Sequence, residues 1–118
     1  MENQITCVFQ LSVKNGMLDN FKVLVEKVVA ATRKEAETLA YFYSVDQSGQ
    51  VVHIIEQYAN SLALVSHIDQ TFAPFADDFI SMVDIGKLTV YGNPDQNAKL
   101  RLNNFGAMYL TPFDGFIG

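Results

Sequence analysis

The sequence predicts a single α+β domain whose strands and helices follow the order β-α-β-β-α-β. Three observations lead to this prediction. Four segments have the patterns of strands, amphipathic helical patterns separate them in two places, and a turn sequence joins the two middle strands. The length of 118 residues is typical of one domain with a core of its own.

The first strand is expected at residues 5–13, where one face is strongly apolar and an Asn-Gly pair follows the segment. Residues 17–37 carry the longest helical pattern, because apolar residues recur three and four positions apart. Glu35 and Glu37 lie at the end of this pattern, where the helix dipole disfavours carboxylates. The helix is therefore expected to end early.

The middle strands are expected at residues 40–46 and 50–58, which are rich in β-branched and aromatic side chains. The turn residues between them predict a hairpin. Asn60 is expected to cap a second helix, which Pro74 interrupts or restarts. Residues 85–91 then form the fourth strand.

Two β-α-β halves joined by a hairpin make up the ferredoxin-like order, in which a four-stranded antiparallel sheet carries helices on one face. The other face is left bare, and in the expected register it contains Val8, Val51, Ile55, Leu88 and Val90. Such an apolar surface needs a cover. We expect a second copy of the chain to provide it, so that the protein is a homodimer.

Residues 93–118 are expected to form a C-terminal extension to the domain of residues 1–92. Pro94 suits a first helical turn, and Gly106 is typical of a helix end. The segment beyond Gly106 is rich in apolar and aromatic residues, unlike a disordered tail. This helical and extended tail is expected to pack on the same domain or on the partner subunit.

The composition argues against several classes of function. The net charge is −5 and no more than two basic residues are adjacent. The sequence therefore has no cluster of basic residues that would bind the phosphate groups of nucleic acids or membranes. Cys7 is the only cysteine, which is compatible with a reducing compartment. The N-terminus lacks the pattern of a signal peptide, and no apolar run approaches the roughly 20 residues that span a bilayer. We expect a cytoplasmic protein.

The segment from residue 37 to residue 75 resembles the antibiotic biosynthesis monooxygenase (quinol-monooxygenase-like) family of dimeric α+β barrels. That family commonly has a glutamate in the third strand, an aromatic residue two positions later and a histidine in the following helix. Here these positions hold Glu56, Tyr58 and His67. The aromatic residue is usually tryptophan, so Tyr58 departs from the pattern. With the order of elements added, the resemblance covers residues 4–91.

The resemblance implies a cavity between sheet and helices in which small planar or oxygenated molecules are oxidised, often without metal or flavin. The implied function is that of a small homodimeric, cofactor-independent monooxygenase-like oxidoreductase acting on an aromatic or quinol-like molecule. Such an enzyme needs a base that makes an electron-rich substrate anion, which then reduces oxygen itself. Two alternatives stay open: a non-catalytic dimer that binds a small molecule, and an isomerase of a small carbonyl compound.

His67 and Glu56 are the candidate catalytic residues. Imidazole is a base near neutral pH, and the alternative for His67 is a structural role between helix and sheet. Burial of Glu56 among apolar strand residues would raise its pKa, and the alternative is a structural hydrogen bond from His67 to Glu56. The residues expected to contact the substrate are Tyr43, Tyr58, Phe72 and Phe75.

No metal and no other cofactor is expected. His53 and His67 lie on different elements and do not make a ligand set. No glycine-rich phosphate loop is present. Heme degradation is disfavoured, because the related branch uses a pocket tryptophan and this chain has none. Cys7 is expected to be a small buried hydrophobic residue rather than a nucleophile.

Overall fold

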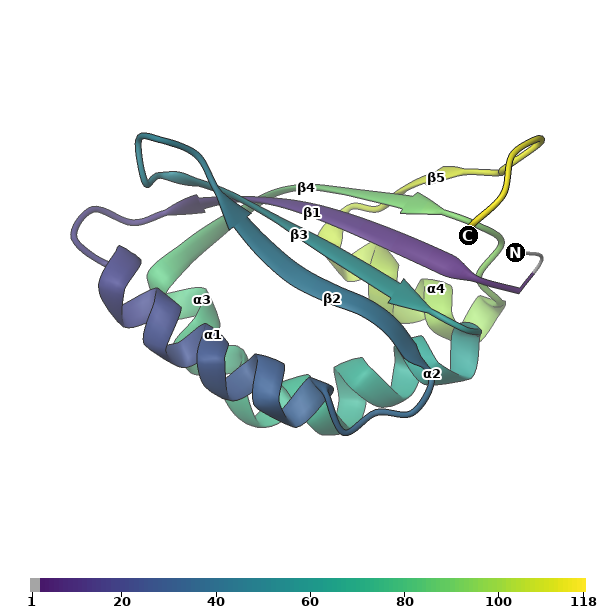
Figure 1. Ribbon diagram of the computed structural model, residues 1–118, viewed down its shortest axis with the longest axis horizontal. Helices are drawn as coiled ribbons and strands as arrows, with labels where there is room; N and C mark the ends of the chain where they lie inside the picture. The colour runs from purple at the N-terminus through teal and green to yellow at the C-terminus, as the bar shows by residue number, and fades with distance from the viewer. Residues whose placement is uncertain (1–2) are drawn as a thin grey trace.

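The computed structural model describes residues 3–118, which form one sheet with helices packed against one of its faces (Figure 1). The strand order in the sheet is β2-β3-β1-β4-β5. The first four strands in the chain pair antiparallel, whereas the short last strand pairs parallel with its neighbour. The strands are β1 (Ile5–Val13), β2 (Thr38–Val45), β3 (Val51–Tyr58), β4 (Val83–Tyr91) and β5 (Met108–Leu110).

The predicted ferredoxin-like order is confirmed, and the helical layer is more segmented than the sequence pattern indicates. The α-helices are α1 (Leu18–Thr32), α2 (Ser61–Ser66), α3 (Ala76–Met82) and α4 (Gln96–Leu102). A π-helix (His67–Phe72) and a short 3₁₀-helix (Ala73–Phe75) connect α2 to α3. Pro74 lies in that 3₁₀ turn, since proline has no N–H to donate to an α-helix interior.

Two local predictions from the sequence are confirmed. Helix α1 ends at Thr32, so that Glu35 lies in the loop that follows it. Asn60 caps α2, because its side-chain oxygen accepts a hydrogen bond of 2.9 Å from the backbone N–H of Ala63. The side-chain N–H of Asn60 also donates a hydrogen bond of 2.6 Å to Oε2 of Glu37, which connects the loop before β2 to the start of α2.

The face of the sheet that contacts the helices carries the core. Along β3 the burial alternates, so that every second side chain from Val52 to Tyr58 is buried. The facing residues of β1 are mostly buried as well, including Cys7 and Leu11. Helix α1 contributes Phe21 and other side chains to this layer. Glu56 is thereby placed on the buried face, as the sequence predicts.

The predicted register of β4 is wrong by one residue. Leu88 and Val90 are fully buried on the helix side, whereas the sequence pattern placed them on the bare face. The cause is a shift in the pairing with β1, where Gln10 pairs with Lys87 and Leu11 already pairs with Ile85. The extra residue, Gly86, reverses the orientation of all later side chains in β4.

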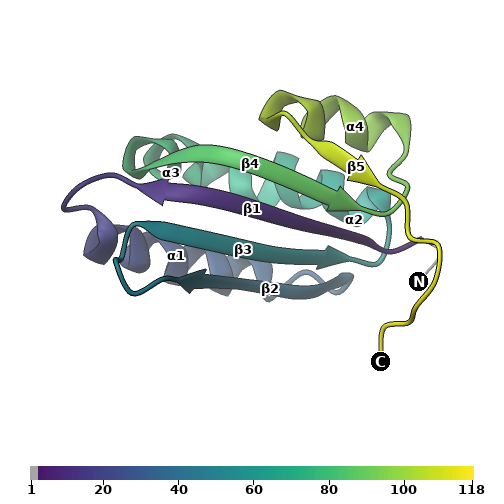
Figure 2. The ribbon, with the colours of Figure 1, turned by 90° about the horizontal axis from the view of Figure 1, so that it is seen from above.

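The C-terminal segment adds to the predicted sheet. Strand β5 extends it beside β4 (Figure 2), so the sheet has five strands rather than four. Gly106 ends the helical part with a φ of 67°, a left-handed value that favours glycine. Beyond β5, Phe113 is completely exposed and Phe116 is 89% exposed. The division at residue 92 and the homodimer stay predictions.

Among residues 3–118, no helix combines the length and the apolar character that a membrane crossing requires.

Candidate functional site

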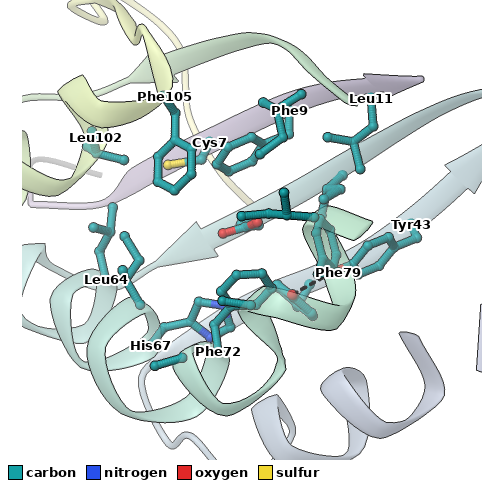
Figure 3. A pocket seen from close by; sticks show the side chains of 18 residues that line it. Cys7, Phe9, Leu11, Tyr43, Leu64, His67, Phe72, Phe79, Leu102 and Phe105 are labelled. Carbon is teal, nitrogen blue, oxygen red and sulfur yellow. Dashed lines mark hydrogen bonds between the residues drawn. The ribbon is translucent and has the colours of Figure 1, made fainter. Parts of the chain in front are cut away.

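A cavity of about 230 Å³ lies between the buried face of the sheet and the helical layer (Figure 3). Its walls are mostly apolar, with side chains from β1, the π-helix, α3 and the segment after α4. Phe72 and Phe105 are two of the aromatic side chains that surround it (Figure 3). The polar side chains among its lining residues are few: Tyr41, Tyr43, Glu56 and His67. Polar groups in such a dry setting interact strongly with one another and with any ligand.

Strand pairing places Tyr41, Tyr43 and Glu56 close together in the cavity wall. Glu56 of β3 is directly opposite Tyr41 of β2 on one side and Cys7 of β1 on the other. In the next row towards the hairpin, Tyr43 is opposite Ile54. Directly opposite residues on one face of a sheet have Cβ atoms about 4.5–5.5 Å apart. The register alone therefore places a carboxyl group beside a tyrosine in the cavity wall.

His67 is the first residue of the π-helix and is 2% exposed. Its Nδ1 lies 3.1 Å from Oε2 and 3.2 Å from Oε1 of Glu35. The hydroxyl of Thr38 donates a hydrogen bond of 2.6 Å to Oε1 of Glu35. Because a carboxylate accepts hydrogen bonds, Nδ1 carries the proton and Nε2 of neutral His67 is the basic nitrogen.

The expected structural hydrogen bond between Glu56 and His67 is not formed, and Glu35 takes the place of Glu56. The loop after α1 brings Glu35 against the start of the π-helix, whereas Glu56 is bonded within its own strand. The hydroxyl of Tyr58 donates a hydrogen bond of 2.6 Å to Oε1 of Glu56. Both side chains of this second pair are buried.

Burial raises the pKa of the Glu56 carboxyl above its ordinary value of 4.5. The positive charge that His67 can carry and the hydrogen bond from Tyr58 oppose this rise, and the charge of Glu35 adds to it. A carboxyl group with a raised pKa is suited to proton transfer near neutral pH. Glu56 is therefore a candidate for proton transfer in the cavity that His67 also lines.

Tyr41 and Tyr43 form a pair of hydroxyl groups in the wall of the cavity. Their oxygens lie 2.8 Å apart, and the rings meet edge to face at a centroid distance of 5.5 Å. Burial raises the pKa of both hydroxyls, and the nearby charge of Glu56 raises it further. Both side chains therefore stay neutral hydrogen-bond donors at physiological pH.

Four of the six predicted site residues line the same cavity: Glu56, His67, Tyr43 and Phe72. Tyr58 does not line it, because it is fully buried and contacts the site through its hydrogen bond to Glu56. Phe75 also lies outside the lining and packs against the core beside α1. The roles assigned to these residues stay predictions.

Sequence reasoning missed two residues of the site. Glu35 was considered only for its effect on the end of a helix, and nothing in the local pattern connects it to a histidine 32 positions later. Tyr41 is not among the residues predicted to contact the substrate. Its position two residues before Tyr43 on one strand face is a signal that could have found it.

In the described part of the chain, residues 3–118, no group of three His, Cys, Asp or Glu side chains is arranged to hold a metal ion. Cys7 is buried, and burial raises the pKa of its thiol, with a further contribution from the charge of Glu56. This agrees with the prediction of a small buried hydrophobic residue.

Comparisons with known proteins show which solved structures share this fold. No protein-family model matches the sequence, and no curated protein matches it. Solved structures do match. The crystal structure of MupZ from Pseudomonas fluorescens has a TM-score of 0.86 and 21% sequence identity, over 100% of this chain and 91% of that chain.

Two further structures connect the fold to oxygenases. SnoaB, a cofactor-independent oxygenase from Streptomyces nogalater, has a TM-score of 0.68 and 12% identity, over 80% of this chain and 96% of its own. A structure described as an antibiotic biosynthesis monooxygenase has a TM-score of 0.63 and 25% identity, over 73% of this chain and 92% of its own. The chain therefore has the fold of antibiotic biosynthesis monooxygenases, and the resemblance seen in the sequence is confirmed at that level.

Proposed function

We propose that the protein is a cofactor-independent monooxygenase-like oxidoreductase that acts on an aromatic or quinol-like small molecule. One observation carries the proposal. His67, held by Glu35 through Nδ1, lines an otherwise largely apolar cavity that also contains Glu56 and has room for a small ring. The likeness to SnoaB, which is described as a cofactor-independent oxygenase, supports the same class of reaction.

His67 is the base in this proposal. Its Nε2 has no hydrogen-bond partner among residues 3–118, so it is left to accept a proton from a ligand in the cavity. Glu35 stabilises the imidazolium that results, as a carboxylate next to a histidine does in other enzymes. Glu56 takes or returns a second proton, for which its raised pKa is suited.

The reaction balances with molecular oxygen as the only co-reactant. His67 takes the proton of a phenolic hydroxyl, and a ring carbon of the resulting anion forms a bond to oxygen. Protonation gives a hydroperoxide on a carbon that still carries its hydrogen. Loss of that hydrogen as a proton and cleavage of the O–O bond give a quinone and water. The substrate loses four electrons and oxygen gains four.

A proton-transfer enzyme for a small carbonyl compound is the second candidate, because two titratable groups lie in one cavity. That reaction moves a proton between two carbons and consumes no oxygen. Oxygen uptake therefore separates the two functions.

The test is oxygen uptake by the purified protein with a panel of hydroquinones and polyphenols, without added flavin or metal. We expect uptake that requires substrate and that falls at least about tenfold in His67→Ala, since general bases contribute about 10²–10⁴-fold. Glu26→Ala is the control, because Glu26 is exposed on α1, away from the cavity and from the bare face of the sheet. A folded protein without uptake on the whole panel would contradict the proposal.

The proposed enzyme is a cytoplasmic homodimer. The face of the sheet opposite the helices exposes apolar side chains, among them Phe42, which is 51% exposed, and Val51. Pairing of two such faces would remove this surface from water. Sedimentation equilibrium should give twice the monomer mass, and a monomer at micromolar concentration would contradict this part of the proposal.

A further inference from the structure

The hydrogen bonds of the two tyrosines in the cavity leave one proton unused. The hydroxyl oxygens of Tyr41 and Tyr43 lie 2.8 Å apart, so one of their two protons forms the bond between them. Each phenolic hydroxyl donates one hydrogen bond and also accepts. Neither oxygen has another partner among residues 3–118. The remaining proton is therefore available to a ligand in the cavity that both side chains line.

Tyr41 is the member of the pair that lies nearer the groups that transfer protons. It is directly opposite Glu56 on the neighbouring strand. Its ring lies 5.0 Å from the ring of His67, measured between centroids. Tyr43 instead contacts Phe21 and Phe79, with centroid distances of 6.1 Å and 6.5 Å. A ligand oxygen within reach of His67 is thus closer to Tyr41.

The geometry points to an oxyanion site: Tyr43 donates to Tyr41, and Tyr41 donates to the oxygen of a bound phenol or enol whose proton His67 removes. The inference rests on the proposed function, because it assigns a partner to the anion that the base creates. The O–H bond of the ligand breaks, an N–H bond forms on Nε2, and the negative charge stays on the ligand oxygen. No electrons are exchanged in this step.

Physical chemistry favours this use of the pair. A donor that itself accepts a hydrogen bond is polarised by it, so the Tyr43 hydroxyl strengthens the Tyr41 hydroxyl as a donor. Donors fixed in a dry cavity stabilise developing charge more than water does. The ligand class follows: a small neutral molecule with a hydroxyl conjugated to a ring or double bond.

The experiment uses 4-nitrophenol as the probe, because its absorbance distinguishes the phenol from the phenolate. Its methyl ether, 4-nitroanisole, has nearly the same shape and no acidic proton. We expect the full-length protein to bind 4-nitrophenol and to lower the pKa of the bound probe relative to the free probe. Absorbance titrations against pH at saturating protein measure this pKa, and calorimetry measures both affinities.

The variants Tyr41→Phe and Tyr43→Phe each remove one hydroxyl and keep the ring. In Tyr41→Phe, the affinity for the phenolate should fall about tenfold and the pKa of the bound probe should rise by about one unit. Tyr43→Phe should have a smaller effect in the same direction, about threefold, because only polarisation is lost. Tyr91→Phe, at an exposed position, is the matched control and should change neither quantity. No variant should alter the affinity for 4-nitroanisole.

Three results would overturn the inference. The first is a folded Tyr41→Phe protein with unchanged affinity and unchanged pKa of the bound probe. The second is an equal loss of affinity for 4-nitrophenol and 4-nitroanisole, which assigns the effect to packing. The third is no binding of 4-nitrophenol by the unmodified protein. None of these measurements depends on oxygen uptake, so failure of the oxyanion site and failure of the proposed oxidation are distinguishable.

Discussion

Glu35 and His67, which are 32 residues apart in the chain, are joined by a hydrogen bond of 3.1 Å between Oε2 and Nδ1. The bond connects the loop after α1 to the first turn of the π-helix. It determines which nitrogen of His67 carries the proton and so which nitrogen is basic. The segment after one helix and the start of another thus together form the base of the proposed site.

Replacement of Glu35 should destabilise the protein. In Glu35→Ala, the buried imidazole of His67 loses its partner, and we expect a loss of about 1–3 kcal/mol in the free energy of unfolding. Glu35→Gln keeps an acceptor for Nδ1 and should lose less. Urea denaturation measures both. Glu26→Ala, at an exposed position of α1, is the control and should lie within about 0.5 kcal/mol of the unmodified protein. Equal stability of Glu35→Ala and the control would contradict the prediction.

The stability should depend on pH through Glu56. Its pKa is raised in the folded protein, because burial disfavours the charged form. Raising the pH through the interval between the ordinary value of 4.5 and the higher folded value therefore removes stability, since the unfolded chain releases the proton first. Glu56→Gln lacks this ionisation. Its stability relative to the unmodified protein should increase as the pH rises from about 4 to about 8.

Urea denaturation at a series of pH values checks this prediction. Gln at position 56 can still accept the hydrogen bond from Tyr58, so the comparison isolates the ionisation. If the free energies of unfolding of the two proteins run parallel over the whole range, the buried carboxyl is not the source of the pH dependence.

Loss of the Tyr58 hydroxyl should cost more than loss of an exposed tyrosine hydroxyl. In Tyr58→Phe, the buried carboxyl of Glu56 loses its donor, and we expect a destabilisation of about 1–3 kcal/mol. The pKa of Glu56 should rise further, because the hydrogen bond from Tyr58 lowers it. Tyr109→Phe is the matched control, since its hydroxyl donates to Asn103 at an exposed site with the same 2.6 Å distance. Thermal and urea denaturation should show the smaller loss there.

Cys7 should be unreactive in the folded protein. Its thiol is buried, and burial raises its pKa, so little thiolate is present at neutral pH. A colourless aromatic disulfide that releases a coloured thiol reports the rate of reaction. We expect slow labelling of the native protein and rapid labelling in denaturing urea. Rapid labelling of the native protein would show that reagents of this size reach the wall of the cavity.

The local elements of this chain follow from local physical chemistry. The alternation of apolar residues in β3 predicts that Glu56 faces the core, and the amide of Asn60 predicts a helix start. Both depend on interactions between residues that are close in the sequence. The order of elements follows in the same way, since each strand and helix carries its own periodic pattern. The likeness to monooxygenases came from a resemblance at Glu56, Tyr58 and His67.

Other features depend on pairings that no local pattern encodes. The shift at Gly86 turns Leu88 and Val90 to the core, because the side-chain period of a strand is two and a single extra residue reverses it. Strand β5 pairs with β4 only after the helical segment between them returns the chain to the sheet edge. In each case the choice rests on packing against distant segments.

The sequence by itself determined the class of fold and the presence of a histidine and a glutamate on faces that point inward. The tertiary structure alone decided that Glu35, 32 positions away in the chain, is the partner of His67. The physical reason is the short range of hydrogen bonds, which require two groups within about 3 Å. Whether residues distant in the chain come that close is settled by strand register and helix packing.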